Sequence, residues 1–227
     1  MNENFRKLNF GAPAAERDIN QGLKEYFYKT ESFKRLKDGQ KRVLLGNRGT
    51  GKSAIFKIIA EEYRERNYIV VEISPEDYSY EILSEVLLKE YEGNWAKQGA
   101  YAAAWKYLIY LLAMKKQAAS DDKLLKREAK SIYNYLRDNH SGQQYTKIDA
   151  LISYLKRIEG VKIAKYEASV KSKNLQKLYK LEEISSLLDD LKKICSKKPI
   201  IFLIDELDRG WDASEDAKAF ISGLFQA

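Results

Sequence analysis

Cysteine and histidine occur once each in this chain of 227 residues, which argues against internal disulfide bonds and against a metal site built on histidine. The single cysteine, Cys195, rules out a framework of internal disulfide bonds and fits a reducing environment. Because Cys195 lies on an apolar helical stripe, we predict a core position for it rather than a catalytic one. The only histidine, His140, is predicted to lie in a loop, and without a second histidine or a cysteine nearby it is a poor metal ligand.

Long apolar runs are also missing. The longest lipid-compatible stretch, residues 101–114, has 14 residues and is interrupted by Lys106, whereas a spanning helix needs about 20 apolar residues. We therefore predict a buried helix here, with Trp95 and Trp105 in its core, and no contact with a membrane. The N-terminus, residues 1–7, leads into polar sequence without the apolar segment of a secretory signal, so we expect a cytoplasmic protein.

The formal net charge of +7 is concentrated in one region. Residues 142–181 contain nine basic residues against three acidic ones, a local excess of six positive charges. The nine are Lys147, Lys156, Arg157, Lys162, Lys165, Lys171, Lys173, Lys177 and Lys180. Two interpretations stay open: a binding surface for nucleic acid or another polyanion, and a solvated lysine-rich face.

A glycine-rich motif near the N-terminus points to phosphate binding. It follows a predicted strand at residues 42–45 and leads into a predicted helix that ends near Glu65, which is the context of a phosphate-binding loop. Glycines let backbone N–H groups approach phosphate oxygens, Lys52 is placed for the β- and γ-phosphates, and Ser53 for Mg²⁺. The predicted nucleotide-binding residues are Gly46, Asn47, Arg48, Gly49, Thr50, Gly51, Lys52, Ser53 and Ala54.

A second motif lies far downstream. The apolar run Ile200–Ile204 predicts a fully buried parallel strand, and it ends at Asp205-Glu206-Leu207-Asp208. Ligands of doubly wound sheets bind at such strand ends, so we predict Asp205 as a Mg²⁺ ligand and Glu206 as the catalytic base, beside Lys52. The plainer alternative is that these acids cap a helix.

The sequence predicts an α/β fold, with a three-layer core around a parallel sheet and a large helical insertion before the Asp205 strand. We place the first half of the core at residues 1–78, the insertion at 79–197, and the second strand motif with its following helix at 198–227.

Further predictions concern individual helices and candidate contacts with the nucleotide base. Helices are expected at residues 14–27, at 31–36 with Thr30 as N-cap, and at 181–195. The Phe10-Gly11 turn and residues 16–18 are candidates for contact with the nucleotide base, or simply pack on the sheet.

Together the two motifs resemble those of P-loop ATPases of the additional-strand catalytic-glutamate division, especially AAA+ and STAND ATPases. Residues 10–53 are similar to a group of bacterial P-loop ATPases found in mobile or defence-related contexts. In these families the counterparts of Lys52 and Ser53 bind phosphate and Mg²⁺, that of Asp205 supports the metal, and that of Glu206 activates water. The resemblance implies ATP and Mg²⁺ as ligands and permits a homo-oligomer.

The resemblance also has gaps. The sensor strand of this division normally follows the Asp-Glu motif, yet only 19 residues follow Asp208, so we expect an N-terminal part of a longer protein with an incomplete sheet. The leading hypothesis is an ATP-driven switch. The alternative is a nucleotide-gated DNA- or RNA-binding module with little hydrolysis, and a small-molecule kinase is the weakest reading because no acceptor-binding arginine cluster is present.

Overall fold

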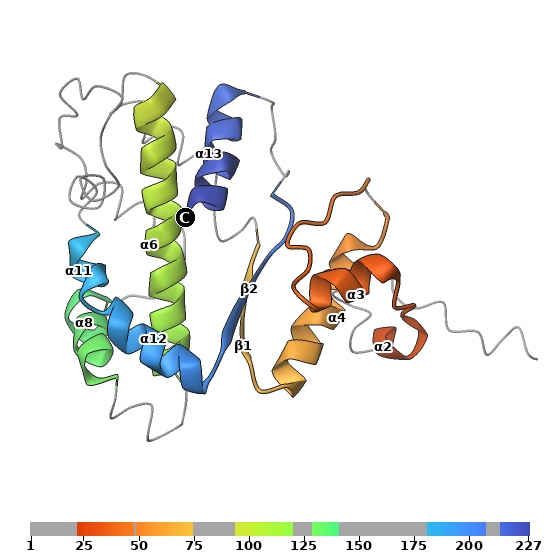
Figure 1. The fold of residues 1–227 in the computed structure, drawn as a ribbon, viewed down its shortest axis with the longest axis horizontal. Helices are drawn as coiled ribbons and strands as arrows, with labels where there is room; N and C mark the ends of the chain where they lie inside the picture. Colours follow the sequence, from red (N-terminus) through yellow and green to blue (C-terminus); the bar gives the residue numbers. More distant parts are fainter. Residues whose placement is uncertain (1–21, 48, 75–93, 120–128, 141–180, 208–213) are drawn as a thin grey trace, which may run out of the picture. The chain divides into compact units, whose positions relative to one another are not determined.

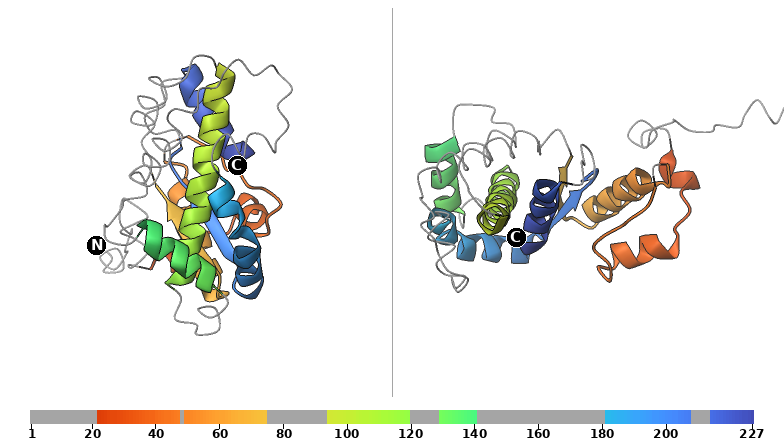
Figure 2. Two further views of the ribbon diagram at one scale, coloured as in Figure 1. Left: turned by 90° about the vertical axis from the view of Figure 1, so that its left-hand side faces the viewer. Right: turned by 90° about the horizontal axis from the view of Figure 1, so that it is seen from above.

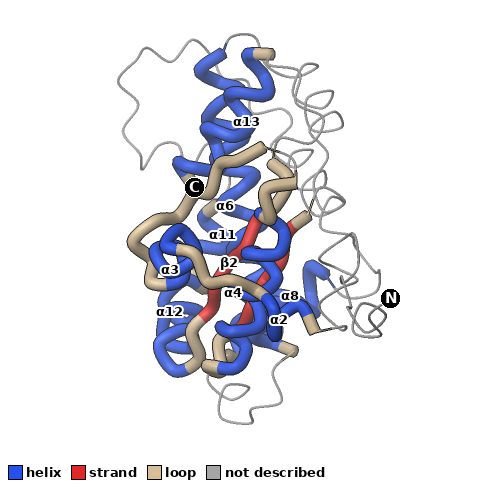
Figure 3. The backbone as a smooth tube through the Cα atoms, turned by 90° about the vertical axis from the view of Figure 1, so that its right-hand side faces the viewer, coloured by secondary structure: helices blue, strands red, loops and turns tan. Residues whose placement is uncertain are grey.

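The structure is a computed structural model that describes residues 22–47, 49–74, 94–119, 129–140, 181–207 and 214–227. Helices predominate in these ranges, and strands β1 (Ile69–Ile73) and β2 (Ile200–Ile204) form a two-stranded parallel sheet (Figures 1 and 3). The strand predicted at Ile200–Ile204 is confirmed, but its five residues are half-buried rather than fully buried as predicted. The chain divides into two compact units, Met1–Val70 and Val71–Ala227. Across the described ranges, no helix combines the length and apolarity needed to cross a membrane.

The first unit contains helices α2 (Leu23–Tyr26), α3 (Glu31–Lys37) and α4 (Lys52–Glu65). Phe33 is fully buried and packs edge-to-face against Phe27, with ring centroids 5.2 Å apart. The predicted cap of α3 is confirmed, since the Thr30 hydroxyl accepts a 3.2 Å hydrogen bond from the Phe33 N–H. α4 ends where the left-handed Asn67 (φ 64°) turns the chain toward β1.

The helix predicted for residues 14–27 is not continuous. Gly22 has φ 101°, a left-handed conformation outside the helical region, and only the single turn of α2 follows it. The apolar spacing of Leu23 and Tyr26 suits a helix, but it carries no information on the backbone at Gly22. Residues before Gly22 lie outside the described ranges.

The second unit contains α6 (Asn94–Ala118), α8 (Lys130–His140), α11 (Glu182–Ser185), α12 (Leu188–Lys197) and α13 (Glu215–Gln226). α6 is the predicted core helix, and α13 lies along it in both views of Figure 2. Trp105 is 1% exposed and its indole packs on Phe220 of α13, with ring centroids 5.0 Å apart. The core position predicted for Trp105 is confirmed, and Trp95 lies in the first turn of α6.

The contact between α6 and α13 is close because of a glycine. A Cβ at Gly223 would lie 2.7 Å from Tyr101 Cβ and 2.8 Å from the backbone nitrogen of Ala102. Real Cβ atoms do not approach other atoms so closely, so only glycine fits at this point of the helix pair. The helix that follows β2 therefore shares one core with the long helix of the predicted insertion.

Two helical predictions in this unit need correction. The helix expected over 181–195 is two helices, α11 and α12, separated by a turn at Ser186 and Leu187 in which the Leu187 N–H bonds Ile184 O at 2.9 Å. Serine side chains compete for backbone groups, which favours a break at this point. His140 is the last residue of α8 rather than a loop residue, and its Nε2 lies 3.4 Å from the Tyr107 hydroxyl.

Candidate functional site

Two glycines of the glycine-rich loop have left-handed backbone conformations. Gly49 and Gly51 both have φ 83°, which side-chain-bearing residues rarely adopt, and Gly51 is the N-cap of α4. α4 then runs for 14 residues, as predicted, and its first turn contains no acidic side chain. In that turn the backbone N–H groups have no partner within the helix, and the helix dipole favours an anion beside them.

The loop is tied internally through the main-chain oxygen of Asn47. This oxygen accepts from the Thr50 hydroxyl at 2.8 Å and from the Thr50 N–H at 3.3 Å. A Cβ at Gly46 would lie 2.7 Å from the same Thr50 hydroxyl, so the hydroxyl occupies space that glycine leaves open. Arg48 lies outside the described residues.

The Lys52 ammonium lies over its own loop. Its Nζ donates to Gly46 O at 2.7 Å and to Asn47 O at 3.0 Å, and both contacts are exposed to solvent. The side chain therefore folds back across the loop rather than extending into solvent. Lysine is a compact point charge suited to phosphate oxygens, so this position fits an anion held by the loop.

The strand predicted at residues 42–45 is not formed. No regular structure is assigned to this segment, in which Val43 is 50% exposed and Leu45 87% exposed. A strand needs a neighbour for its backbone groups, and the sheet in the described residues consists of β1 and β2 alone. The apolar residues 43–45 have the composition of a strand, but the sequence does not show which strand would pair with them.

The second motif lies at the end of β2, as predicted. Asp205 follows the last strand residue, and its N–H donates to Ile73 O of β1 at 3.2 Å. The Asp205 carboxylate accepts a 2.8 Å hydrogen bond from the Glu206 N–H. Glu206 has φ 51°, a left-handed conformation that costs a side-chain-bearing residue about 1–2 kcal/mol. Such strain concentrates at functional sites, which agrees with a special role for this residue.

The predicted site residues therefore form two groups. Gly46, Asn47, Thr50 and Lys52 contact one another in the first unit, and Ser53 and Ala54 lie in the first turn of the same helix. Asp205 and Glu206 contact one another in the second unit. The meeting of the two groups around one triphosphate stays a prediction. Within the described residues, three or more His, Cys, Asp or Glu side chains do not gather into a metal cluster.

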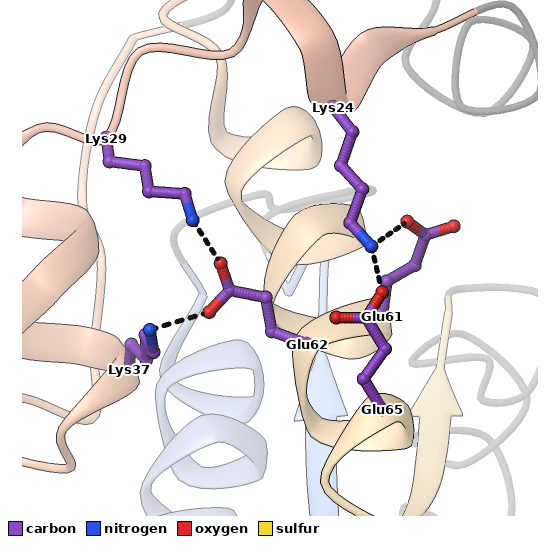
Figure 4. A network of polar contacts seen from close by, with 6 residues as sticks. All are labelled: Lys24, Lys29, Lys37, Glu61, Glu62 and Glu65. Atoms are coloured by element: carbon purple, nitrogen blue, oxygen red, sulfur yellow. Dashed lines mark hydrogen bonds and ion pairs between the residues drawn. The ribbon is translucent and has the colours of Figure 1, made fainter.

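The second half of α4 is held by an ion-pair network that the sequence reasoning missed (Figure 4). The Glu62 carboxylate accepts from Lys29 Nζ at 2.7 Å and lies 2.8 Å from Lys37 Nζ, so a lysine just before α3 and the last residue of α3 meet one side chain. Lys24 pairs with Glu61 at 3.6 Å and also with Glu65. Charge alternation along the sequence suggests such pairs but does not indicate which residues meet.

Glu62 is well enclosed, with 11% of its side chain exposed. Burial alone raises the pKa of this carboxyl, but the hydrogen bonds from Lys29 and Lys37 outweigh burial, so the pKa lies below its usual value. The charged carboxylate is therefore the form that links α3 to α4.

The single thiol has a structural position. Cys195 is half-buried, and its Sγ lies 3.7 Å from Nε2 of the buried Gln117, which also donates to Lys198 O at 3.0 Å. Burial raises the pKa of the Cys195 thiol, which lowers its reactivity. These contacts agree with the predicted core role.

Several predictions concern parts of the chain that the structure does not describe. The basic region at 142–181 lies outside the described residues except for Leu181, and so do the candidate base contacts at residues 10, 11 and 16–18. Asp208 is also outside them.

The described residues define an α/β protein with a small parallel sheet, mostly helical elements and a glycine-rich loop that opens a helix. A family described as "Protein of unknown function (DUF815)", which is related to AAA+ ATPase-like proteins, matches residues 16–91. This match includes the loop, α4 and β1.

One similar protein is the "Putative transposon gamma-delta 80.3 kDa protein" of Escherichia coli (strain K12). The two are 24% identical over an alignment of 230 positions, which covers the whole of this chain but only 32% of that protein's length. The chain thus spans about a third of this relative. No solved structure matches the chain.

Proposed function

We propose that this chain binds ATP through residues 46–54 and hydrolyses it as a nucleotide-driven switch. The observation that carries the proposal is the position of the Lys52 ammonium, 2.7 Å from Gly46 O, at the start of a helix that two left-handed glycines precede. The match to a family related to AAA+ ATPase-like proteins supports it, because that match contains the loop.

A task is proposed for the loop backbone and for Lys52, Ser53, Asp205 and Glu206. The N–H groups at the start of α4 and the Lys52 ammonium hold phosphate oxygens, and the lack of acidic side chains in the first turn of α4 fits a triphosphate. Ser53 and Asp205 offer the hydroxyl and carboxylate oxygens that Mg²⁺ prefers, and the ion neutralises charge on the phosphates when it is bound. Glu206 accepts a proton from the attacking water.

The proposal is tested by measuring Mg·ATP binding and phosphate release with the wild-type chain and two variants. Lys52→Ala should remove binding, because the loop loses its point charge. Glu206→Gln should retain binding and stop turnover, because the amide is not a base. Wild-type protein that does not bind Mg·ATP contradicts the proposal, and unchanged hydrolysis in Glu206→Gln removes the assignment of the base alone.

A second candidate, a nucleotide-gated nucleic-acid-binding module, is favoured by the local excess of basic residues at 142–181 and by the word "transposon" in the name of the similar protein. In this case Lys171, Lys173 and Lys177 contact phosphates, and binding to random duplex DNA weakens steeply with salt. Changing the three lysines to Glu should remove that binding. If the wild-type chain does not bind duplex DNA at about 50 mM salt, a condition that favours such contacts, the second candidate is excluded and only the first remains.

A further inference from the structure

The side chain of Thr50 is the feature of the loop that the proposed function does not use. It lies between Gly49 and Gly51, both of which have φ 83°. Glycine loses more conformational freedom on ordering than any other residue, so a loop with glycines on both sides of one residue is costly to fix. A contact that fixes this loop before nucleotide arrives removes part of that cost from binding.

Thr50 makes such a contact. Its hydroxyl donates to Asn47 O at 2.8 Å, and its own N–H donates to the same oxygen at 3.3 Å. Lys52 Nζ is the third donor to Asn47 O, at 3.0 Å. The oxygen that positions the lysine is thus itself positioned by the threonine.

Gly46 completes the arrangement. A Cβ at this position would lie 2.7 Å from the Thr50 hydroxyl, while its next neighbours, Thr50 Cβ and Lys52 Cδ, would lie at ordinary distances of 3.7 and 3.8 Å. The left-handed glycines of the loop are Gly49 and Gly51, so Gly46 has no such backbone requirement. A Cβ at Gly46 would therefore displace the Thr50 hydroxyl.

We infer that Thr50 is a positioning residue for nucleotide binding: its hydroxyl, seated in the space left by Gly46, holds Asn47 O where it orients Lys52. The inference rests on the proposed function and deepens it. Thr50 itself has no role in the chemistry, because it acts through the lysine. The role belongs to the hydroxyl rather than to the methyl group, so serine should serve as well as threonine.

The test is a double-mutant cycle on Mg·ATP affinity, measured by titration calorimetry on the full chain. Thr50→Ala and Gly46→Ala should each weaken binding by about three- to tenfold, the worth of one hydrogen bond. The double variant should bind no more weakly than the poorer single variant, because the added Cβ then meets no hydroxyl. Thr50→Ser should bind within about twofold of wild type.

Urea unfolding of the nucleotide-free variants is measured alongside, and each variant is expected to unfold cooperatively, as a folded protein does. Three results would overturn the inference but not the proposed function. They are wild-type Mg·ATP affinity in Thr50→Ala, losses of affinity that multiply independently in the double variant, and a loss in Thr50→Ser as large as that in Thr50→Ala. Wild-type protein that does not bind Mg·ATP overturns the proposed function and this inference together.

Discussion

The indole N–H of Trp105 in α6 donates a 3.1 Å hydrogen bond to the main-chain oxygen of Phe220 in α13. This bond is buried, and the ring of Tyr101 also packs edge-to-face on Phe220 with centroids 5.4 Å apart. α13 follows β2 and the Asp205 motif in the chain, whereas α6 belongs to the predicted insertion. The two helices therefore form one structural unit, and substitutions in α6 are expected to affect the stability of the part of the chain that carries Asp205.

Gly223→Ala tests the packing of this helix pair. Alanine in place of glycine usually stabilises a helix by about 1 kcal/mol, but here the new Cβ meets Tyr101 at 2.7 Å. We expect the free energy of unfolding in urea to fall by about 1–3 kcal/mol, the usual cost of overpacking. Lys218→Ala, at an exposed position of α13, is the control and should change it by less than about 0.5 kcal/mol. A stabilised Gly223→Ala would show that the helices are not in close contact.

Glu62→Gln tests the ion pairs that hold α3 on α4. The neutral amide leaves Lys37 without its opposite charge, and the Lys37 side chain is only 23% exposed. The free energy of unfolding should fall by about 1–2 kcal/mol, since bonds to charged groups are worth more than neutral ones. Glu31→Gln is the matched control, because Glu31 pairs with Arg35 at the surface and such pairs contribute about 0.5 kcal/mol or less. Equal losses of unfolding free energy in the two variants would show that the Glu62 ion pairs contribute no more than the surface pair of Glu31.

The free energy of unfolding should depend on pH through the ionisation of Glu62. Its pKa in the folded protein lies below the ordinary 4.5, because the hydrogen bonds from Lys29 and Lys37 outweigh the effect of burial. A lowered pKa means that the unfolded chain takes up the proton first as pH falls. The stabilisation is thus complete well above pH 4.5 and is lost below it. Measured from pH 7 to 3, the difference between wild type and Glu62→Gln should shrink, and a constant difference contradicts the assignment.

Glu206→Gly separates strain from chemistry. Glu206 has φ 51°, which glycine adopts without cost, although glycine also makes the unfolded chain more flexible. We expect the free energy of unfolding to rise by about 0.5–1 kcal/mol while ATP turnover is lost. Glu206→Gln keeps the strain, so its stability should match that of wild type. A Glu206→Gly variant less stable than Glu206→Gln would show that the side chain stabilises the fold.

The elements that the sequence predicted well are those with strong local signals. α4 and β2 follow from their apolar patterns, and the α3 cap follows from Thr30 alone. The internal bonds of the glycine-rich loop were not predicted, because Asn47 O and Thr50 Oγ1 are brought together by the left-handed backbone at Gly49, which a sequence motif does not describe.

Other features depend on contacts between distant residues. Val43 and Leu45 have the composition of a strand, but pairing decides whether a strand forms. The positions of Glu62 and its lysines likewise require the packing of α3 on α4 to be known. The helix break at Ser186 and Leu187 is local, yet apolar spacing continues through it, so periodicity alone predicts one helix.

The presence of a single cysteine, the half-buried Cys195, has a practical consequence for labelling. Because this is the chain's only cysteine, a single substitution such as Cys195→Ala gives a background into which two new thiols can be introduced for fluorescent labels. Lys41 and Lys218 are exposed and belong to different compact units, so they are suitable attachment points. Energy transfer between a donor and an acceptor at these points, measured with and without Mg·ATP, would show whether the separation of the two labelled positions changes.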